Sequence, residues 1–157
     1  MAVIEASGEI NASPEAIWRV VLGYEQWPEW SPLFQMVEPE TPEIGLNGEW
    51  KLNGVIGRIP YTGLFRQIDH HPLERFVFAS IRVSPPFDFI RHSVFLGADG
   101  PRPQLTWRID YKMSGGPGGW IIDRLLVRRG LDGFLERMPV ALEKHVSFSQ
   151  ERSRAAR

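Results

Sequence analysis

The sequence predicts an α+β fold, in which a curved antiparallel sheet of about seven strands wraps around a long C-terminal helix and two short helices follow the first strand. Three observations carry this prediction. Residues typical of helix starts follow the first apolar run, near residue 13. The middle of the chain consists of short runs in which apolar and polar residues alternate, separated by turn residues. After the glycine-rich segment 115–119, the apolar residues change to a helical spacing.

The N-terminal segment predicts one strand and then two short helices. The partly alternating run Val3–Ile10 is expected to form the first strand. Ser13 suits the N-cap position of a helix and Pro14 suits its first turn, and an amphipathic helix should end near Gly23. The second short helix is expected at Tyr24–Trp30.

The middle of the chain predicts an antiparallel meander. Pro39–Gly48 is a loop by composition, and the segments HHPLE, SPPFD and GADGPRP mark turns between the later runs. Short alternating runs with turns between them are typical of antiparallel sheets, so we expect about six strands here. These strands are Phe34–Glu38, Glu49–Ile56, Ile59–Ile68, Arg75–Val83, Phe89–Leu96 and Gln104–Lys112.

The C-terminal part predicts one long helix. Apolar residues recur at helical spacing from Ile121 to Val146, which indicates a helix of about 25 residues. Pro139 should kink this helix, because proline removes a backbone hydrogen bond and crowds the preceding turn. A length of 157 residues fits one domain, expected at 1–150, with a frayed tail at 151–157.

The composition argues against several classes of site and partner. The chain has no cysteine, so it forms no disulfide and no thiolate metal site, and no histidine spacing indicates another metal site. We therefore expect no metal and no cofactor. A net charge of −1 argues against nucleic-acid binding, and no apolar run is long enough for stable insertion into a membrane. The first residues lack the pattern of a secretory signal, so a cytoplasmic protein is expected.

Charge is unevenly distributed along the chain. Residues 1–50 carry nine Glu and one Arg, whereas residues 51–157 carry 17 basic and 10 acidic residues. The simpler interpretation is that folding interleaves the two halves into a mixed surface. The asymmetry is also compatible with a homodimer or with an anionic ligand, and the sequence alone leaves these alternatives open.

Several short segments carry a resemblance to a known family. ASPEAIWRVV and WPEW suit its pair of short helices, QIDHHPLERFVF a strand–turn–strand segment, and QLTWRIDYKM its last strand. GGPGGWIIDRLL and ALEKH suit the two ends of its long helix. In this order the segments resemble the helix-grip superfamily of START domains, Bet v 1-type proteins and bacterial polyketide cyclase/dehydrase-like proteins. The resemblance implies a cavity between the sheet and the long helix, closed at one end by the short helices.

Alternation predicts which strand residues face the interior. In Gln104–Lys112 the charged residues should face water, and the apolar residues between them should face inward. The outward set is Arg108, Asp110 and Lys112. The inward sets are Leu105, Trp107, Ile109 and Tyr111 here, Trp50, Leu52 and Ile56 in an earlier strand, and Ile90, His92, Val94 and Leu96 in another. For the strands 59–68 and 75–83, the sequence does not decide which face points inward, because apolar residues occupy both faces.

The predicted interior is apolar and aromatic with a few polar groups, which is typical of a small-molecule pocket. A buried His92 would be neutral at pH 7 and could polarise a carbonyl or accept a proton. The alternative is a filled core in which His92 and Tyr111 bond to local backbone. No catalytic residue is assigned, because no carboxylate is placed inward. The predicted ligand-binding residues are Trp30, Trp50, Leu52, Tyr61, Phe78, His92, Trp107, Ile109, Tyr111, Trp120, Leu126 and Phe134.

Three functions remain open at this point. The preferred one is binding of a hydrophobic small molecule, such as a lipid, an isoprenoid or a polyketide-like compound, in the implied cavity. The second is a polyketide cyclase/dehydratase-type enzyme that moves protons with His92, Tyr111 or Tyr61. The third is a protein-interaction module with a filled core. Fold alone does not decide between them.

Overall fold

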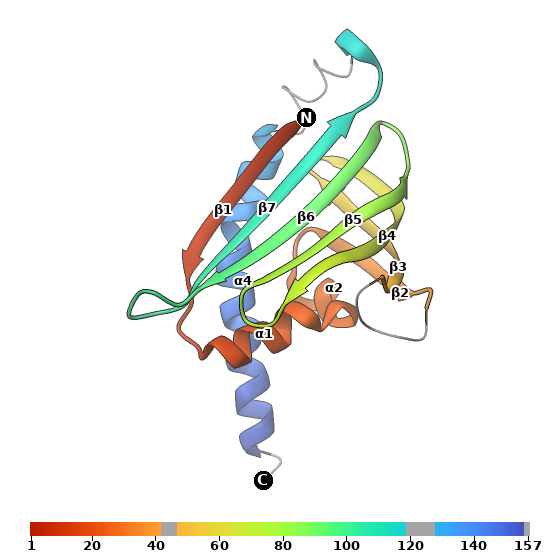
Figure 1. The fold of residues 1–157 in the computed structure, drawn as a ribbon. Helices are drawn as coiled ribbons and strands as arrows, with labels where there is room; N and C mark the ends of the chain where they lie inside the picture. The colour runs from red at the N-terminus through yellow and green to blue at the C-terminus, as the bar shows by residue number, and fades with distance from the viewer. Residues whose placement is uncertain (42–46, 119–127, 156–157) are drawn as a thin grey trace.

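The computed structural model describes residues 1–41, 47–118 and 128–155, and it has the predicted architecture (Figure 1). A curved antiparallel sheet of seven strands packs with a long C-terminal helix, and two short helices follow the first strand. In chain order the elements are β1 (Ala2–Glu9), α1 (Pro14–Leu22), a 3₁₀ turn (Tyr24–Gln26), α2 (Trp27–Trp30), β2 (Phe34–Pro39), β3 (Glu49–Ile56), β4 (Ile59–His71), β5 (Arg75–Val83), β6 (Phe87–Gly97), β7 (Gln104–Met113) and α4 (Arg128–Ala155).

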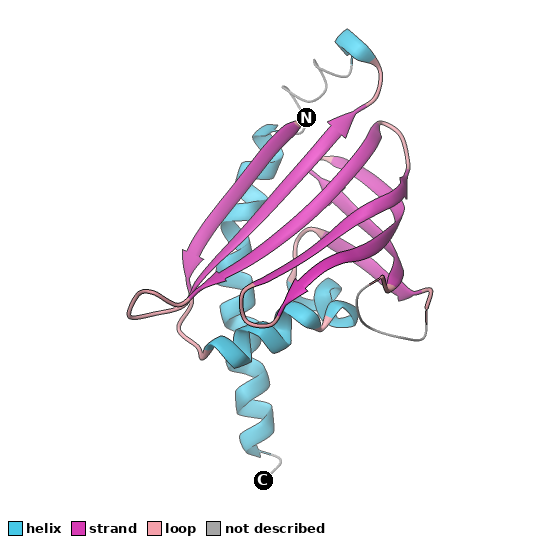
Figure 2. Ribbon diagram, in the orientation of Figure 1, coloured by secondary structure: helices cyan, strands magenta, loops and turns pink. Residues whose placement is uncertain are grey.

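The sheet has one simple topology. Its strands lie in the order β1-β7-β6-β5-β4-β3-β2, and every neighbouring pair is antiparallel. Strands β2 to β7 therefore form the predicted meander, and β1 closes the edge beside β7. Figure 2 shows α1, α2 and α4 on one side of the curved sheet, with α1 and α2 near one end of it. The C-terminal part of α4 continues past α1 (Figure 1).

Signals in the sequence fix the start and the end of α1. The side-chain oxygen of Ser13 accepts a hydrogen bond from the backbone N–H of Ala16 at 3.2 Å, which caps the first turn. At the other end, the backbone N–H of Gly23 donates to the carbonyl oxygen of Arg19 at 3.1 Å. The indole N–H of Trp27 then donates to the carbonyl oxygen of Val21 at 3.0 Å. This bond ties α2 to α1.

The inward phases predicted for β3, β6 and β7 are confirmed, because every residue assigned inward there is buried. Aromatic residues decide the two phases that the sequence left open. Tyr61 and Phe65 of β4 are buried. In β5, Phe76 and Phe78 are 0–2% exposed, whereas the other face carries Val77 and Ala79 at 8% and Ile81 at 44%. Large aromatic side chains gain the most from leaving water, so the phase that carries them becomes the inner one.

The histidine pair of β4 differs from the prediction. His70 and His71 were expected in a turn, but β4 continues to His71 and pairs with the start of β5, where His70 lies opposite Phe76. The indole N–H of Trp18 donates to His70 Nε2 at 3.2 Å, which adds a contact from α1 to this end of the strand. Pairing with β5 therefore extends the strand beyond Ile68, where the expected strand ended.

Asp110 was expected to face water, and this prediction is wrong. Its side chain lies on the outer face of β7 but is only 2% exposed. Arg108 donates two hydrogen bonds to its carboxylate, at 3.1 and 3.0 Å, and a nitrogen of Arg91 lies 3.4 Å away. Burial alone would raise the pKa of Asp110. The two guanidinium groups lower it by more than burial raises it, so the pKa of Asp110 lies below its ordinary value. Flanking arginines thus cover an outward carboxylate.

The long helix packs closely against β1. It continues through Pro139, whose ring lies against Gly8, where an added Cβ atom would be only 2.7 Å from the Cβ of Pro139. Glycine at this position lets the strand and the helix approach. The kink predicted at Pro139 stays a prediction, and residues 121–127 of the predicted helix lie outside the described residues. At the other end α4 is described to Ala155, within the segment predicted to fray.

No helix within the described ranges is long and apolar enough to cross a membrane.

Replacement of Gly54 by alanine should lower the free energy of unfolding by about 1–3 kcal/mol. A Cβ atom at Gly54 would lie 2.6 Å from the hydroxyl oxygen of Tyr61 and 2.7 Å from the carbonyl oxygen of Leu33. The carbonyl belongs to the backbone and cannot rotate away. Urea unfolding measures the loss. Gly97→Ala is the matched control, because the nearest atom to its added Cβ is 3.9 Å away. Equal losses in both variants would contradict this steric account.

Candidate functional site

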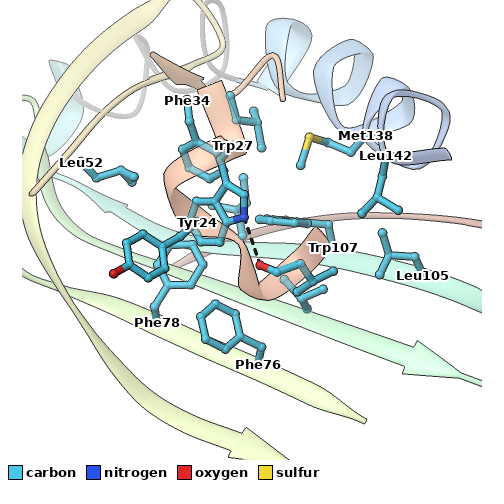
Figure 3. Close-up of a cluster of buried hydrophobic side chains, with 14 of the residues drawn as sticks. Tyr24, Trp27, Phe34, Leu52, Phe76, Phe78, Leu105, Trp107, Met138 and Leu142 are labelled. Atoms are coloured by element: carbon cyan, nitrogen blue, oxygen red, sulfur yellow. Dashed lines mark hydrogen bonds between the residues drawn. The ribbon is translucent and has the colours of Figure 1, made fainter. Parts of the chain in front are cut away.

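The interior next to α1 and α2 is filled by aromatic side chains (Figure 3). The ring of Trp27 is centred 4.9 Å from that of Phe34 and 5.1 Å from that of Phe78. The ring of Trp50 stacks on Tyr24 at 5.2 Å. These contacts make this end of the interior a packed core, which joins the short helices to the inner face of the sheet.

His92 lies on the inner face of β6, at the border of this core. Its side chain is 0% exposed and stacks on Phe78, with ring centroids 4.7 Å apart and an interplanar angle of 9°. The ring of Phe34 is 5.4 Å away. Burial among these rings lowers the pKa of His92 from 6.5 to about 3, because the charged imidazolium would lose its hydration. The imidazole is therefore neutral at pH 7.

A single hydrogen bond fixes the tautomer of His92. The indole N–H of Trp107 donates to His92 Nδ1 at 3.1 Å, across the β6–β7 pair. Indole nitrogen can only donate, so Nδ1 acts as the acceptor and the proton of the neutral ring resides on Nε2. Nε2 is buried and has no hydrogen-bond partner among the described residues. His92 thus presents an unsatisfied N–H donor to the interior.

Tyr61 on β4 presents a second unsatisfied group. Its side chain is 2% exposed, and its hydroxyl has no hydrogen-bond partner in the described part of the chain. Burial raises the pKa of Tyr61 far above its ordinary value of 10.0, so the hydroxyl keeps its proton. The hydroxyl lies over Gly54, where no side chain intervenes.

Phe65 connects the two polar groups. Its ring is centred 6.0 Å from the ring of Tyr61 and 6.3 Å from the ring of His92. On the far side of Tyr61, the ring of Phe87 is 6.0 Å away, and Phe87 in turn lies 6.2 Å from Tyr111. The unsatisfied groups therefore lie in one continuous aromatic surface that runs over β4, β6 and β7.

This buried aromatic surface carries few other polar groups. Apart from tyrosines and tryptophans, the buried polar or charged side chains of the described residues are Ser31, Gln67, His92, Ser93 and Asp110, and Asp110 lies on the outer face. No cluster of three or more His, Asp or Glu residues in these ranges could hold a metal ion. A general acid–base pair of histidine and carboxylate is accordingly not assembled by the described inner-face residues.

A family model described as polyketide cyclase / dehydrase and lipid transport matches residues 1–146. The chain belongs to this family. The sequence has no significant match among curated proteins.

Several solved structures share the fold of this chain. The protein TTHA0849 from Thermus thermophilus is 19% identical, with a TM-score of 0.77 over 94% of this chain and 99% of that one. A START superfamily protein from Mycobacterium smegmatis is 18% identical, with a TM-score of 0.72 over 92% and 97%. The Zhui aromatase/cyclase from a Streptomyces species is 18% identical, with a TM-score of 0.68 over 96% and 94%. At these identities the likeness establishes the fold alone.

The residues predicted from the sequence to bind ligand fall into four sets within this family fold. Trp50, Leu52, Phe78 and Trp107 belong to the packed core around Trp27. Tyr61, His92, Ile109 and Tyr111 lie on the inner face, with Ile109 directly opposite His92 in the β6–β7 pair. Trp30 is half-buried beside His145 at the end of α2. Trp120 and Leu126, and the side chain of Phe134, lie outside the described residues.

Three aromatic residues near the unsatisfied groups were missed by the sequence. Phe65 shares the phase of Tyr61, so it would have been found once the phase of 59–68 was known. Phe87 was assigned to a turn, but β6 begins there, directly after the cis Pro85–Pro86 bond. Phe34 begins β2, a strand whose register shifts at its first residues. Only Phe65 carried a readable signal, namely its spacing from Tyr61.

Proposed function

We propose that this protein binds a hydrophobic small molecule, of the lipid, isoprenoid or polyketide-like kind, on the inner face of the sheet around Tyr61, Phe65 and His92. One observation carries the proposal. A fully buried hydroxyl and a fully buried imidazole N–H lack partners on an otherwise apolar surface of the described residues. Leaving a polar group buried and unsatisfied costs about 1–3 kcal/mol, and a ligand that bonds to these groups would recover that energy.

The surroundings of these groups suit a hydrophobic ligand. The aromatic side chains of Phe65, Phe78 and Phe87 and the aliphatic side chains of Ile90 and Ile109 are all 0–2% exposed. Apolar walls with a few polar atoms are usual in small-molecule sites, because the walls give affinity and the polar atoms fix orientation. Family membership supports the same assignment, since the family description names lipid transport as well as polyketide cyclisation.

Catalysis in the manner of an aromatase/cyclase is the second candidate, and the name of one structural neighbour favours it. The protonation state and the hydrogen bond of His92 argue against it. A base whose pKa is about 3 is nearly always unprotonated at pH 7 but abstracts protons weakly, and Nδ1 is already engaged by Trp107. His92 is suited to donating a hydrogen bond rather than to moving a proton. Binding is therefore the better supported function.

The third candidate, a protein-interaction module with a filled interior, makes an opposite prediction for one variant. Ile109 is 0% exposed and lies beside His92. If the inner face holds a ligand, Ile109→Phe should occupy ligand space, keep its stability and lose binding. If the interior is filled, the larger ring should cost about 1–3 kcal/mol of stability.

The experiment that tests the proposed function combines thermal unfolding with a ligand panel. Wild-type protein and Ile109→Phe are each heated with and without a fatty acid ester, an isoprenoid alcohol and an aromatic polyketide. We expect at least one compound to raise the melting temperature of the wild type and not that of Ile109→Phe. Ile81→Phe, on the exposed outer face, is the matched control and should respond as the wild type does. A destabilised Ile109→Phe together with an unresponsive wild type would favour the filled interior.

A further inference from the structure

The unsatisfied polar atoms of the buried interior share one property, which is that they donate hydrogen bonds. Among the described residues they are His92 Nε2, the hydroxyl of Tyr61, and the indole nitrogens of Trp30 and Trp50. An indole nitrogen only donates, and Nε2 of His92 only donates while Trp107 holds Nδ1. The hydroxyl of Tyr61 can also accept, but its proton still needs an acceptor. These four donors therefore lack acceptors among the described residues.

We infer that the ligand of this site is an uncharged molecule that presents an oxygen acceptor, such as a ketone, ester or quinone carbonyl, to His92 Nε2 and to the hydroxyl of Tyr61. This inference rests on the proposed function and specifies the ligand class. The ring of Phe65 is centred 6.0 Å from that of Tyr61 and 6.3 Å from that of His92, so both donors belong to residues that border the same apolar side chain. A carbonyl oxygen has two lone pairs and no proton, which makes it a suitable partner for either group.

Charge excludes two common alternatives. A carboxylate, as in a free fatty acid, would need a cation to offset its lost hydration, and none of the buried side chains of the described inner face is basic except the neutral His92. A protonated amine would need acceptors and a negative charge nearby, and of the unpartnered groups only the hydroxyl of Tyr61 can accept. The site thus favours a neutral oxygen acceptor over both charged classes.

Trp107 is a positioning residue in this account. It forms no hydrogen bond with the ligand, but its indole N–H keeps the proton of His92 on Nε2. Without that bond either nitrogen of the imidazole could carry the proton, and His92 could then accept a hydrogen bond from a ligand as well as donate one. The preference for acceptors should therefore depend on Trp107 as well as on the two donors.

Matched probes test the inference. Methyl naphthyl ketone, ethylnaphthalene and naphthoate share one ring system and differ in the polar group, and a long-chain methyl ketone with its matching alkane repeats the comparison on a flexible scaffold. The quantity of interest is the ratio of ketone affinity to hydrocarbon affinity. We expect that ratio to fall roughly tenfold in Tyr61→Phe and in His92→Phe, the effect of one lost hydrogen bond. Naphthoate should bind more weakly than the ketone.

Control variants separate this inference from the proposed function. Phe65→Leu removes apolar contact from the same place and should weaken ketone and hydrocarbon equally. Trp107→Phe should lower the ketone preference and raise affinity for the corresponding naphthyl alcohol, and nitrogen NMR of the His92 ring should report the shifted tautomer. An infrared carbonyl band of the bound ketone should move to lower frequency in the wild type and return in Tyr61→Phe and His92→Phe.

The outcomes are distinct. Equal ketone-to-hydrocarbon ratios in wild type, Tyr61→Phe and His92→Phe, with both probes bound, would overturn the inference and leave hydrophobic binding standing. Tighter binding of naphthoate than of the ketone would overturn it as well. Binding of neither scaffold in any form of the protein would remove both the inference and the proposed function.

Discussion

Replacement of Trp27 by alanine should lower the free energy of unfolding by about 3–5 kcal/mol, the range for deleting a fully buried large aromatic side chain. Trp27 is 0% exposed and lies within ring-contact distance of Phe34, Phe78 and Trp107. Its indole N–H also ties α2 to α1. At about 2–4 °C per kcal/mol for a chain of this size, the melting temperature should fall by roughly 10 °C.

The nearby tryptophan of α2 provides the matched control. Trp30 is only half-buried, and its indole nitrogen has no hydrogen-bond partner among the described residues. Trp30→Ala should therefore cost clearly less than Trp27→Ala in calorimetry or urea unfolding. If the two replacements cost the same, Trp27 would not be the centre of the core that supports the inner face.

The stability of the wild type should fall steeply as the pH drops from about 6.5 towards 3, and His92 should account for a separable part of that fall. Burial depresses the folded-state pKa of His92 to about 3. Between pH 6.5 and 3, His92 therefore binds a proton in the unfolded chain but stays neutral in the folded protein. Protonation then favours unfolding by about 1.4 kcal/mol per pH unit. Above pH 6.5 both states are neutral at this residue, and the contribution disappears.

Urea unfolding of wild type and His92→Phe at a series of pH values measures this effect. The variant leaves the indole N–H of Trp107 without its acceptor, which lowers its stability by a constant amount at every pH. The stability gap between the two proteins should therefore shrink steadily below pH 6.5. Parallel curves for wild type and His92→Phe would contradict a buried, neutral His92.

The fold was predictable from local signals, because most of them point the same way. The inward set of β7 follows from charged residues that alternate with apolar ones, and the start of α1 follows from Ser13 and Pro14. The phases of β4 and β5 were not predictable, since apolar residues occupy both faces of each strand and only their contacts across the sheet select one. Asp110 was misplaced because alternation predicts the face of a residue and not what covers that face.

The candidate site was predictable only in part. His92 could be placed inward because Ile90 and Val94 share its phase. That its Nδ1 would meet Trp107 depends on the register between β6 and β7, which no local pattern contains. The packing of Trp50, Phe78 and Trp107 around Trp27 likewise depends on where Trp27 enters from α2.

Native mass spectrometry of freshly purified protein, followed by denaturing extraction, tests the central claim most directly. We expect a reproducible small lipophilic mass on the 18.0 kDa chain, absent from Ile109→Phe and reduced in Tyr61→Phe. A bare 18.0 kDa chain, with no stabilisation of the protein by any lipid, isoprenoid or polyketide tested, would contradict binding on the inner face of the sheet.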